Sequence, residues 1–351
     1  ATELSGSGSD FDVVTIKDVP GYATLVQKNT LESLDDYITD AGINLADFNG
    51  ITDQVTVDGS LYELPFRSDY WLIYYNKDVF DAAGIAYPSN DMTMEDYDAL
   101  ARQLTDTTYG SQVYGCHYHT WRSAVELFGI LDGKHSILDG NYDWMIPYYD
   151  MILSEEDDGV CQTYTDLSTE GLHYSAAFSN GNVAMMNMGS WFISTLISNL
   201  DSGEYDSSLC GNWGIASYPH PDGAEAGSTI ATITGLAVTS ASANKDAAFD
   251  FVNWVSGTEG AKVMASTGNF PAIMTDDVIN TIAGMAGFPT DEGSKEALNI
   301  TNAYLEVPYA ENVSEINSIL DTYHTSIMNR EVTVEEGVAS MNEQVGKILN
   351  Q

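Results

Sequence analysis

The stretch Trp71-Leu-Ile-Tyr-Tyr-Asn-Lys-Asp-Val-Phe-Asp-Ala-Ala-Gly84 determines the fold class of this chain. Its first five residues are aromatic or aliphatic, which is typical of a buried strand, and the residues from Asn76 onward form a helical pattern that ends at Gly84. Further apolar runs of strand character occur at 12–16, 61–65, 182–186, 213–216 and 235–239, with helical patterns between them. Because strands alternate with helices, the sequence predicts an α/β fold with parallel or mixed sheets.

The length of the chain predicts two lobes. It has 351 residues, whereas single hydrophobic cores stop growing at about 250–300 residues. Apolar residues make up 44% of the sequence and charged residues 18%, as in a soluble globular protein. No run of about 18 uncharged apolar residues occurs, so we expect no membrane span within the sequence and any membrane attachment outside it.

The charge of the chain argues against a nucleic-acid partner. The sequence contains 52 acidic and 12 basic residues, which gives a formal net charge of −40. A nucleic-acid binder needs a basic stripe, and Lys and Arg do not cluster anywhere in this sequence. The same acidity is explained by a solvated surface that keeps the protein soluble.

The spacing of the Cys, His and acidic residues does not indicate a metal site. Cys116, Cys161 and Cys210 form no CxxC motif, so neither a zinc ribbon nor a redox motif is indicated, and their pairing stays open. His117 and His119 form an HxH pair without a third ligand at a diagnostic spacing. An acidic segment at 139–150 has partial calcium-loop spacing but lacks the required Gly and Glu. We therefore predict no metal and no cofactor.

Catalytic motifs are absent from the sequence. It contains no GxxxxGK[ST], no GxGxxG after a strand and no GxSxG, so kinase, dehydrogenase and esterase functions lose their usual support. With 52 carboxylates, an acid/base pair for glycoside cleavage could always be proposed, and the number alone carries no information.

Several aromatic residues stand among polar neighbours, which favours a sugar ligand. Trp121 and Trp191 lie near Gly, Ser, Thr or His at the ends of elements, whereas Trp213 and Trp254 lie on apolar faces and are expected in the core. Sugars stack their apolar C–H faces on aromatic rings and need fixed hydrogen-bond partners for their hydroxyls.

The sequence resembles the solute-binding proteins of carbohydrate ABC importers, of which maltose-binding protein is a distant relative. The resemblance spans about residues 10–275 and rests on a set of motifs in family order: Leu64-Pro65, Ile73 to Ile85, Thr93-Met-Glu-Asp-Tyr97, Ala177 to Met186, Gly189-Ser-Trp191, Trp213 to Pro219, Gly235-Leu-Ala-Val238, Lys245 to Trp254 and Thr258-Glu-Gly260. The first strand and helix of the family are not found at the N-terminus.

The resemblance implies a two-lobed α/β fold of the type II periplasmic-binding-protein class. In that fold the ligand lies in a cleft between lobes that close by a hinge. One lobe would comprise residues 1–71 and 238–292, and the other residues 75–232 and 300–351. Three crossovers are expected, near residues 70–75, 232–238 and 290–300.

The resemblance also implies where the ligand binds. Polar contacts are expected after the first strand and just before the first crossover, and aromatic contacts in the second lobe. The predicted ligand-binding residues are Lys17, Asp18, Arg67, Asp69, Trp71, His117, Tyr118, Trp121, Trp191 and Asn269. For Arg67, a structural ion pair with Asp69 is the alternative.

The implied function is capture rather than catalysis. The protein is expected to bind a carbohydrate, most simply a small oligosaccharide, outside the cell and to deliver it to the permease subunits of an ABC transporter. We expect a monomer, attached to the membrane by an N-terminal lipid as in Gram-positive relatives. The alternative is a secreted carbohydrate hydrolase, which would need two carboxylates at a fixed separation of about 5–10 Å, one of them with a raised pKa.

Overall fold

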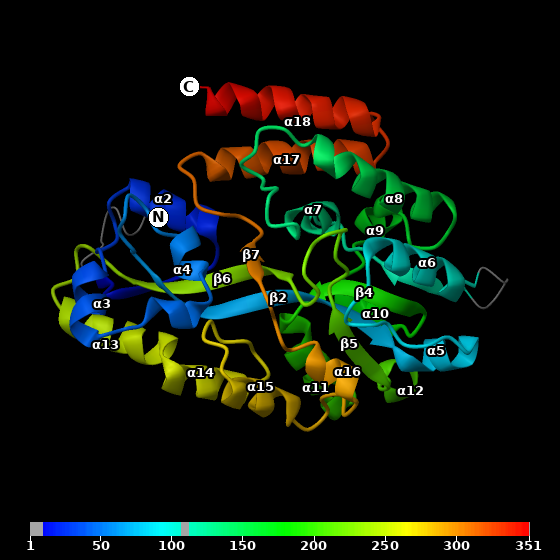
Figure 1. Ribbon diagram of the computed structural model, residues 1–351, viewed down its shortest axis with the longest axis horizontal. Coiled ribbons are helices and arrows are strands. Elements are labelled where there is room, and N and C mark those ends of the chain that lie inside the picture. The colour runs from blue at the N-terminus through cyan, green and yellow to red at the C-terminus, as the bar shows by residue number, and fades with distance from the viewer. Residues whose placement is uncertain (1–9, 107–111, 351) are drawn as a thin grey trace. The chain divides into compact units, whose positions relative to one another are not determined.

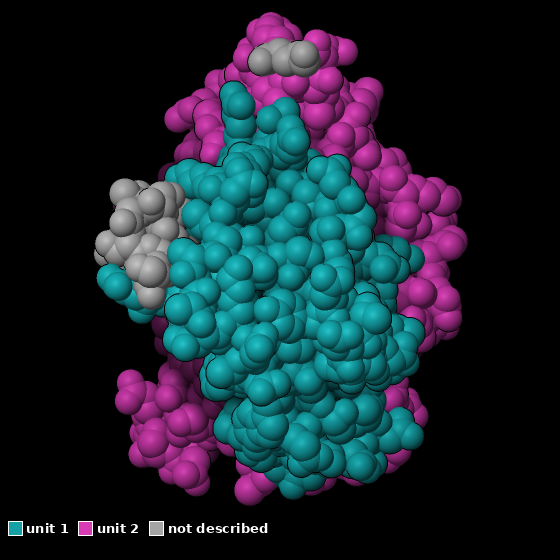
Figure 2. Space-filling view, turned by 90° about the vertical axis from the view of Figure 1, so that its left-hand side faces the viewer, with its two compact units in different colours: residues 1–70, 231–285, 303–315 teal, residues 71–230, 286–302, 316–351 magenta. Residues whose placement is uncertain are grey.

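The computed structural model describes residues 10–106 and 112–350 (Figure 1). The chain divides into two compact units, coloured separately in Figure 2. Unit 1 comprises residues 1–70, 231–285 and 303–315, and unit 2 comprises residues 71–230, 286–302 and 316–351. Both units contain strands and helices.

Unit 1 is built on the strands β1 (Val13–Ile16), β6 (Thr229–Val238), β7 (Ala303–Leu305) and the first part of β2 (Leu64–Asn76). β1 pairs antiparallel with β6, from Val13 opposite Val238 to Ile16 opposite Gly235, and residues 64–70 of β2 pair with β6 as well. The helical elements of unit 1 are α2 (Val19–Gln27), α3 (Asp35–Ala41), η2 (Leu45–Phe48), α4 (Ile51–Gln54), α13 (Lys245–Ser256), α14 (Thr258–Ala265) and α15 (Asp276–Ala283). In Figure 1, α2 and α4 lie on one side of these strands and α13 and α14 on the other.

Unit 2 contains the rest of β2 together with β3 (Tyr114–His117), β4 (Val183–Gly189) and β5 (Trp213–Ser217). β2 pairs antiparallel with β4 and β5, whereas β3 pairs parallel with β4, and every residue of β4 is buried. The helical elements are α5 (Lys77–Ala83), α6 (Met94–Leu104), α7 (Ser123–Ile130), η3 (Asp143–Met145), α8 (Ile146–Asp157), α9 (Tyr164–Glu170), α10 (Tyr174–Ser179), α11 (Trp191–Ser202), α12 (Ser207–Cys210), α16 (Glu292–Glu296), α17 (Val313–Met328) and α18 (Val334–Leu349).

Strand β2 is longer than the sequence indicates. Two separate strands were expected at 61–65 and 71–75, but residues 64–76 form one strand with a register shift between Pro65 and Arg67. The polar residues in its middle continue the strand because their backbone groups pair with β6. Arg67 and Asp69 therefore lie on the same face of an extended chain, since side chains alternate with a period of two.

The chain passes between the units at five places: 70/71, 230/231, 285/286, 302/303 and 315/316. Three crossovers were expected, with all residues after 300 in the second lobe. The additional passages arise because β7 pairs with β6, which draws residues 303–315 into unit 1. Of the helices in the described part of the chain, none has the length and apolar character that crossing a bilayer requires.

Candidate functional site

Five aromatic side chains of unit 2 form one cluster, which we call the aromatic cluster: Trp71, His119, Trp121, Tyr174 and Trp191. Trp71 lies on β2, and Trp191 is the first residue of α11. Tyr174 begins α10, whereas His119 and Trp121 belong to the segment between β3 and α7. The cluster thus gathers residues from four segments of the chain that are far apart in sequence.

The three tryptophan rings contact one another at steep angles. The ring centroids of Trp71 and Trp191 are 5.5 Å apart, those of Trp121 and Trp191 6.2 Å, and those of Trp71 and Trp121 6.3 Å. Trp71 stands nearly perpendicular to both partners, with interplanar angles of 82° and 89°. Edge-to-face contacts of this kind are favourable and leave ring faces free to stack on a ligand.

Gly189 sets the position of the Trp191 ring. Gly189 lies opposite Trp71 in the pairing of β2 with β4, two residues before Trp191. A Cβ atom at this position would lie 2.0 Å from the Trp191 ring, so no larger residue fits unless the ring moves. The Tyr74 hydroxyl donates a hydrogen bond of 2.9 Å to the carbonyl oxygen of Gly189, which fixes the end of β4.

Trp121 is held by a buried network at its neighbour Arg122. The Arg122 guanidinium pairs with Glu126 on α7 and with Asp321, and it donates to the carbonyl oxygen of Asn317. Arg122 is buried, whereas the Trp121 side chain is 40% exposed. The network therefore anchors the backbone while the indole ring stays accessible.

Two polar features of the aromatic cluster suit a ligand rich in hydroxyl groups. The Trp71 indole Nε1 is buried and has no hydrogen-bond partner among the described residues, which leaves one donor available. Burial and the nearby His173 lower the pKa of His119 to about 4, so its imidazole is neutral at physiological pH and carries one donor and one acceptor. The cluster thus combines apolar ring faces with uncharged hydrogen-bonding groups.

His117 and Tyr118 are not part of the aromatic cluster. Both side chains are buried, and the Tyr118 ring packs against Tyr97 and Phe128 with centroids 6.4 Å away. Burial lowers the pKa of His117 to about 3. Sequence reasoning grouped Tyr118 with Trp121, but the structure separates them, because Tyr118 packs in the interior of unit 2 whereas Trp121 is exposed.

Arg67 and Asp69 form an ion pair in unit 1. The Arg67 Nε and an Asp69 carboxylate oxygen are 2.6 Å apart, and an Arg67 terminal nitrogen donates a second bond of 3.2 Å to the other oxygen. The Asp69 side chain is 9% exposed and that of Arg67 29%. The ion pair that the sequence left open is therefore present.

Asn269 lies near Arg67. Residues 270–272 bond to the backbone of β2, including Ser68 N–H to the Phe270 carbonyl oxygen at 3.2 Å. This pairing brings Arg67 and Asn269 into the wall of one pocket of about 310 Å³ in unit 1. The Asn269 side chain donates to the Thr267 hydroxyl at 2.9 Å.

Lys17 and Asp18 are exposed at the end of β1, where Asp18 caps α2 by accepting from Gly21 N–H at 2.8 Å. Sequence reasoning missed a third charged residue beside them, Glu63, which is buried in unit 1. Burial, and to a lesser degree the charge of Asp18, raise the pKa of Glu63 to about 8. Its carboxyl group occupies the space beside Gly235, where a Cβ would lie 2.2 Å from one oxygen.

Tyr174 and His119 were also missing from the predicted site. Tyr174 follows His173 at the start of a helix, and an aromatic residue beside a polar neighbour at the end of an element is the kind of signal that identified Trp121 and Trp191. The rings of His117 and His119 are 6.4 Å apart. Among groups of three or more His, Cys, Asp and Glu side chains in the described residues, only Cys116, Glu155 and Cys161 lie close enough together to hold a metal ion.

Comparisons with known proteins agree with this architecture. A sugar transporter from Rhizobium etli, solved in an open conformation, is 47% identical with a TM-score of 0.92, covering 98% of this chain and 87% of that one. Maltose-bound MalE3 of T. maritima is 18% identical with a TM-score of 0.74, covering 99% and 87%. The expected two-lobed periplasmic-binding-protein fold is confirmed by these likenesses.

A curated relative and a family model match the sequence itself. The mannitol-binding protein of Pseudomonas aeruginosa is 24% identical over 272 residues, which cover 75% of this chain and 60% of that protein. The match thus spans less than two thirds of that relative. The model of the bacterial extracellular solute-binding proteins matches residues 1–262. Because this match covers most of the sequence, the chain belongs to the bacterial extracellular solute-binding proteins.

Proposed function

We propose that this protein captures a carbohydrate outside the cell and delivers it to the permease subunits of an ABC transporter. The observation that carries the proposal is the aromatic cluster, in which three tryptophan rings meet within 6.3 Å of one another beside a buried, unpaired indole N–H. Relatives described as a sugar transporter, a mannitol-binding protein and a maltose complex support the same ligand class.

The chemistry of the aromatic cluster favours a short oligosaccharide. One indole face covers about one sugar ring, so Trp121 and Trp191 together offer surface for more than a single ring. The Trp71 N–H and the neutral His119 supply hydrogen bonds that do not require a charged ligand. In unit 1, Asp69 is the proposed acceptor for sugar hydroxyls, held in position by Arg67.

Binding without turnover is part of the proposal. Hydrolysis of a glycoside needs an acid and a second carboxylate on opposite sides of the bond. The proposed site uses one carboxylate, Asp69, which pairs with Arg67, together with aromatic rings and uncharged hydrogen-bonding groups. These groups favour holding a sugar over cleaving it. A monomeric state and attachment through an N-terminal lipid, both implied by the resemblance, remain predictions.

A thermal-shift screen followed by calorimetry tests the proposal. The panel comprises glucose, maltose, mannobiose, longer oligosaccharides and mannitol, with an amino acid and a dipeptide as controls. A ligand at 100 times its dissociation constant adds about 2.7 kcal/mol to the free energy of unfolding, so a true ligand raises the melting temperature clearly. Each ligand is recovered afterwards and examined for cleavage.

The expected result is saturable binding of at least one carbohydrate with the ligand recovered intact. Release of shorter sugars would instead support the hydrolase. Binding of the dipeptide or the amino acid, without any carbohydrate, would keep the family and change the ligand class.

A further inference from the structure

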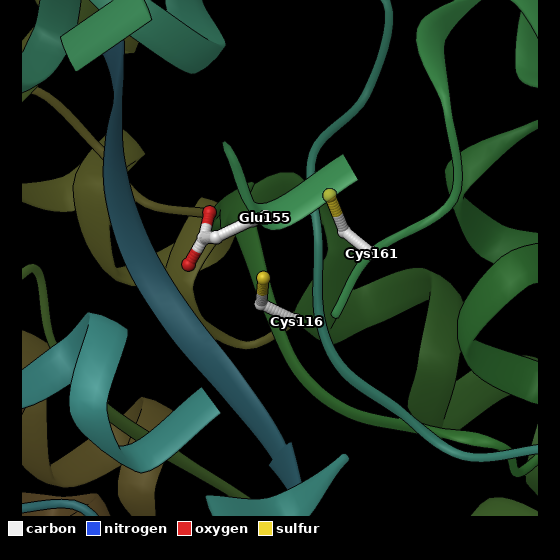
Figure 3. Close-up of side chains that lie close together, drawn as sticks. All are labelled: Cys116, Glu155 and Cys161. Carbon is white, nitrogen blue, oxygen red and sulfur yellow. The ribbon is translucent and has the colours of Figure 1, made fainter. Parts of the chain in front are cut away.

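Cys116, Glu155 and Cys161 form a buried group in unit 2, outside the aromatic cluster (Figure 3). Cys116 lies on β3, Glu155 on α8, and Cys161 in the segment that follows α8. One ligand atom from each residue lies within 4.8 Å of the others. In Figure 3 the three side chains converge on one place from separate segments.

The backbone holds the two cysteine segments together. The carbonyl oxygen of Val160 accepts hydrogen bonds from Gly115 N–H at 2.9 Å and from Cys116 N–H at 3.4 Å. Cys161 directly follows this carbonyl group. The closeness of the two sulfur atoms is therefore imposed by β3 and the turn after α8 rather than by the side chains alone.

Glu155 is a second, independent indication of a ligand at this place. Its side chain is fully buried, and within the described ranges neither carboxylate oxygen has a hydrogen-bond partner. The Tyr118 hydroxyl lies beside both Cys116 and Glu155 and completes the polar lining of this place. Buried polar groups normally have hydrogen-bond partners, so a buried carboxylate whose two oxygens both lack one indicates a missing ion or water.

Another buried acid of unit 2 shows how such a group is usually stabilised. Glu126 is equally buried, but its carboxylate pairs with Arg122, the residue just before that helix. The cation nearest to Glu155, Arg102, forms its ion pairs with Asp98 and Asp158 instead. A bound cation would supply the missing partner and favour the ionised form.

We propose that Cys116, Glu155 and Cys161 bind one Zn²⁺ ion in the interior of unit 2. Two thiolates and one carboxylate are a donor set that zinc accepts, and the sulfur atoms disfavour Ca²⁺ and Mg²⁺. A fourth position remains for the Tyr118 hydroxyl or a water molecule. The ion links β3, α8 and the turn after α8, so its role is to stabilise unit 2. Residue spacing did not reveal this site because the ligands are 39 and 6 positions apart in the sequence.

Metal titration of the reduced protein tests the proposal. The full chain is treated anaerobically with a phosphine reductant, stripped of metal and titrated with Zn²⁺ against a chromophoric chelator, and with Co²⁺ as a spectroscopic probe. We expect one ion per chain, a thiolate-to-cobalt charge-transfer band and a higher melting temperature with Zn²⁺. Cys116→Ser and Cys161→Ser should lose the band, and Glu155→Gln should weaken Zn²⁺ binding at least tenfold.

Matched controls come from the same unit. Cys210 is a buried free cysteine outside the group, and Asp157 is an exposed carboxylate on the same helix as Glu155. Cys210→Ser and Asp157→Asn should bind Zn²⁺ like the unmodified protein. If a cysteine variant does not fold, Glu155→Gln and the cobalt spectrum of the unmodified protein still decide the question.

Three outcomes would overturn the proposal. The first is a reduced protein that binds no Zn²⁺, and the second is binding that Cys116→Ser and Glu155→Gln leave unchanged. The third is a protein isolated without reductant whose Cys116 and Cys161 peptides are cross-linked and whose mass is lower by two hydrogen atoms. That result would identify the pair as a disulfide instead.

Discussion

The aromatic cluster of unit 2 and the Arg67–Asp69 pair of unit 1 have opposite physical characters. The cluster is uncharged, and its rings are positioned by backbone features such as Gly189. The pair is ionic, and its carboxylate is nearly buried. Ring stacking gains free energy in proportion to the apolar area covered. A desolvated carboxylate is stabilised by individual hydrogen bonds, and losing one of them costs free energy because the buried charge is left without a partner. We therefore expect substitutions in the aromatic cluster to reduce sugar affinity gradually, and substitutions in the Arg67–Asp69 pair to reduce it more sharply.

The largest effect is expected for Asp69→Ala, which should weaken sugar binding by about 1.5–3 kcal/mol, the usual range for a hydrogen bond to a charged group. The substitution also leaves the partly buried Arg67 without its partner. Isothermal calorimetry measures the affinity, and circular dichroism checks the fold. Asp69→Asn, which keeps the shape and removes the charge, is the control. Unchanged affinity in both folded variants would mean that the pair is purely structural.

The next effect concerns Trp191→Ala, which should reduce affinity at least tenfold. Covering one sugar face removes about 40–60 Å² of apolar surface from water, worth about 1–1.5 kcal/mol at ~25 cal/mol/Å² before any C–H contact to the ring is counted. Ligand should change the tryptophan fluorescence of the unmodified protein, and most of this change should disappear in the variant. Trp144, half-buried in unit 2 but outside the cluster, provides the control. Equal losses from Trp144→Ala would contradict a specific role for Trp191.

A smaller effect on affinity is expected for Gly189→Ala, because the added methyl group displaces the Trp191 ring without removing it. Overpacking of this kind also costs about 1–3 kcal/mol of stability. In a Trp191→Ala background the same methyl group meets no ring, so the stability cost should largely vanish. Denaturant unfolding of the two single variants and the double variant measures this coupling.

Gly129→Ala is a matched control for that cycle. A Cβ at Gly129 would lie 2.3 Å from the Trp144 ring, which reproduces the steric conflict outside the aromatic cluster. It should lower stability and leave sugar affinity unchanged. Additive effects of Gly189→Ala and Trp191→Ala on stability would show that the ring does not occupy the space beside Gly189.

The smallest expected effect is on stability and concerns Glu63→Gln. The folded-state pKa of Glu63 is raised to about 8 from an ordinary value of 4.5, so folding favours the protonated form. Its contribution to stability is complete below about pH 4.5 and is lost as the pH rises through 8. Gln cannot ionise, so the free energy of unfolding of the variant should be higher than that of the unmodified protein near pH 8. The expected difference is at least about 1 kcal/mol, which corresponds to roughly one pKa unit.

Melting curves between pH 5 and 9 measure this difference, which should shrink toward pH 5. A constant difference across the range would mean that Glu63 does not titrate in this window. Asp18→Asn, which removes the nearby charge, should give a smaller change in the same direction.

Local sequence patterns were sufficient for the parts of the site that depend on local structure. The polar neighbours of Trp121 and Trp191 indicated that these rings belong to a site, and the two rings do come together with Trp71, which only the resemblance had added. The capping box at the start of α6 is local in the same way, because Thr93 and Asp96 are only three residues apart.

Contacts between distant segments could not be predicted in this way. The raised pKa of Glu63 depends on its burial beside Gly235, 172 positions later in the sequence. Tyr118 is adjacent to polar residues in sequence but packs against Tyr97 and Phe128. The inclusion of residues 303–315 in unit 1 follows from the pairing of β7 with β6, which no local pattern encodes.

The antiparallel pairing of β1 with β6 has a consequence for the biosynthesis of the protein. β1 cannot pair with β6 until Gly235, the residue opposite Ile16, has been synthesised. At about 5–20 residues per second, a ribosome needs roughly 10–45 s to add the intervening chain. Unit 1 therefore stays incomplete during most of translation, and contacts of such large sequence separation also form slowly. A chain of this connectivity therefore leaves the pairing edge of β1 without its partner strand for most of its synthesis.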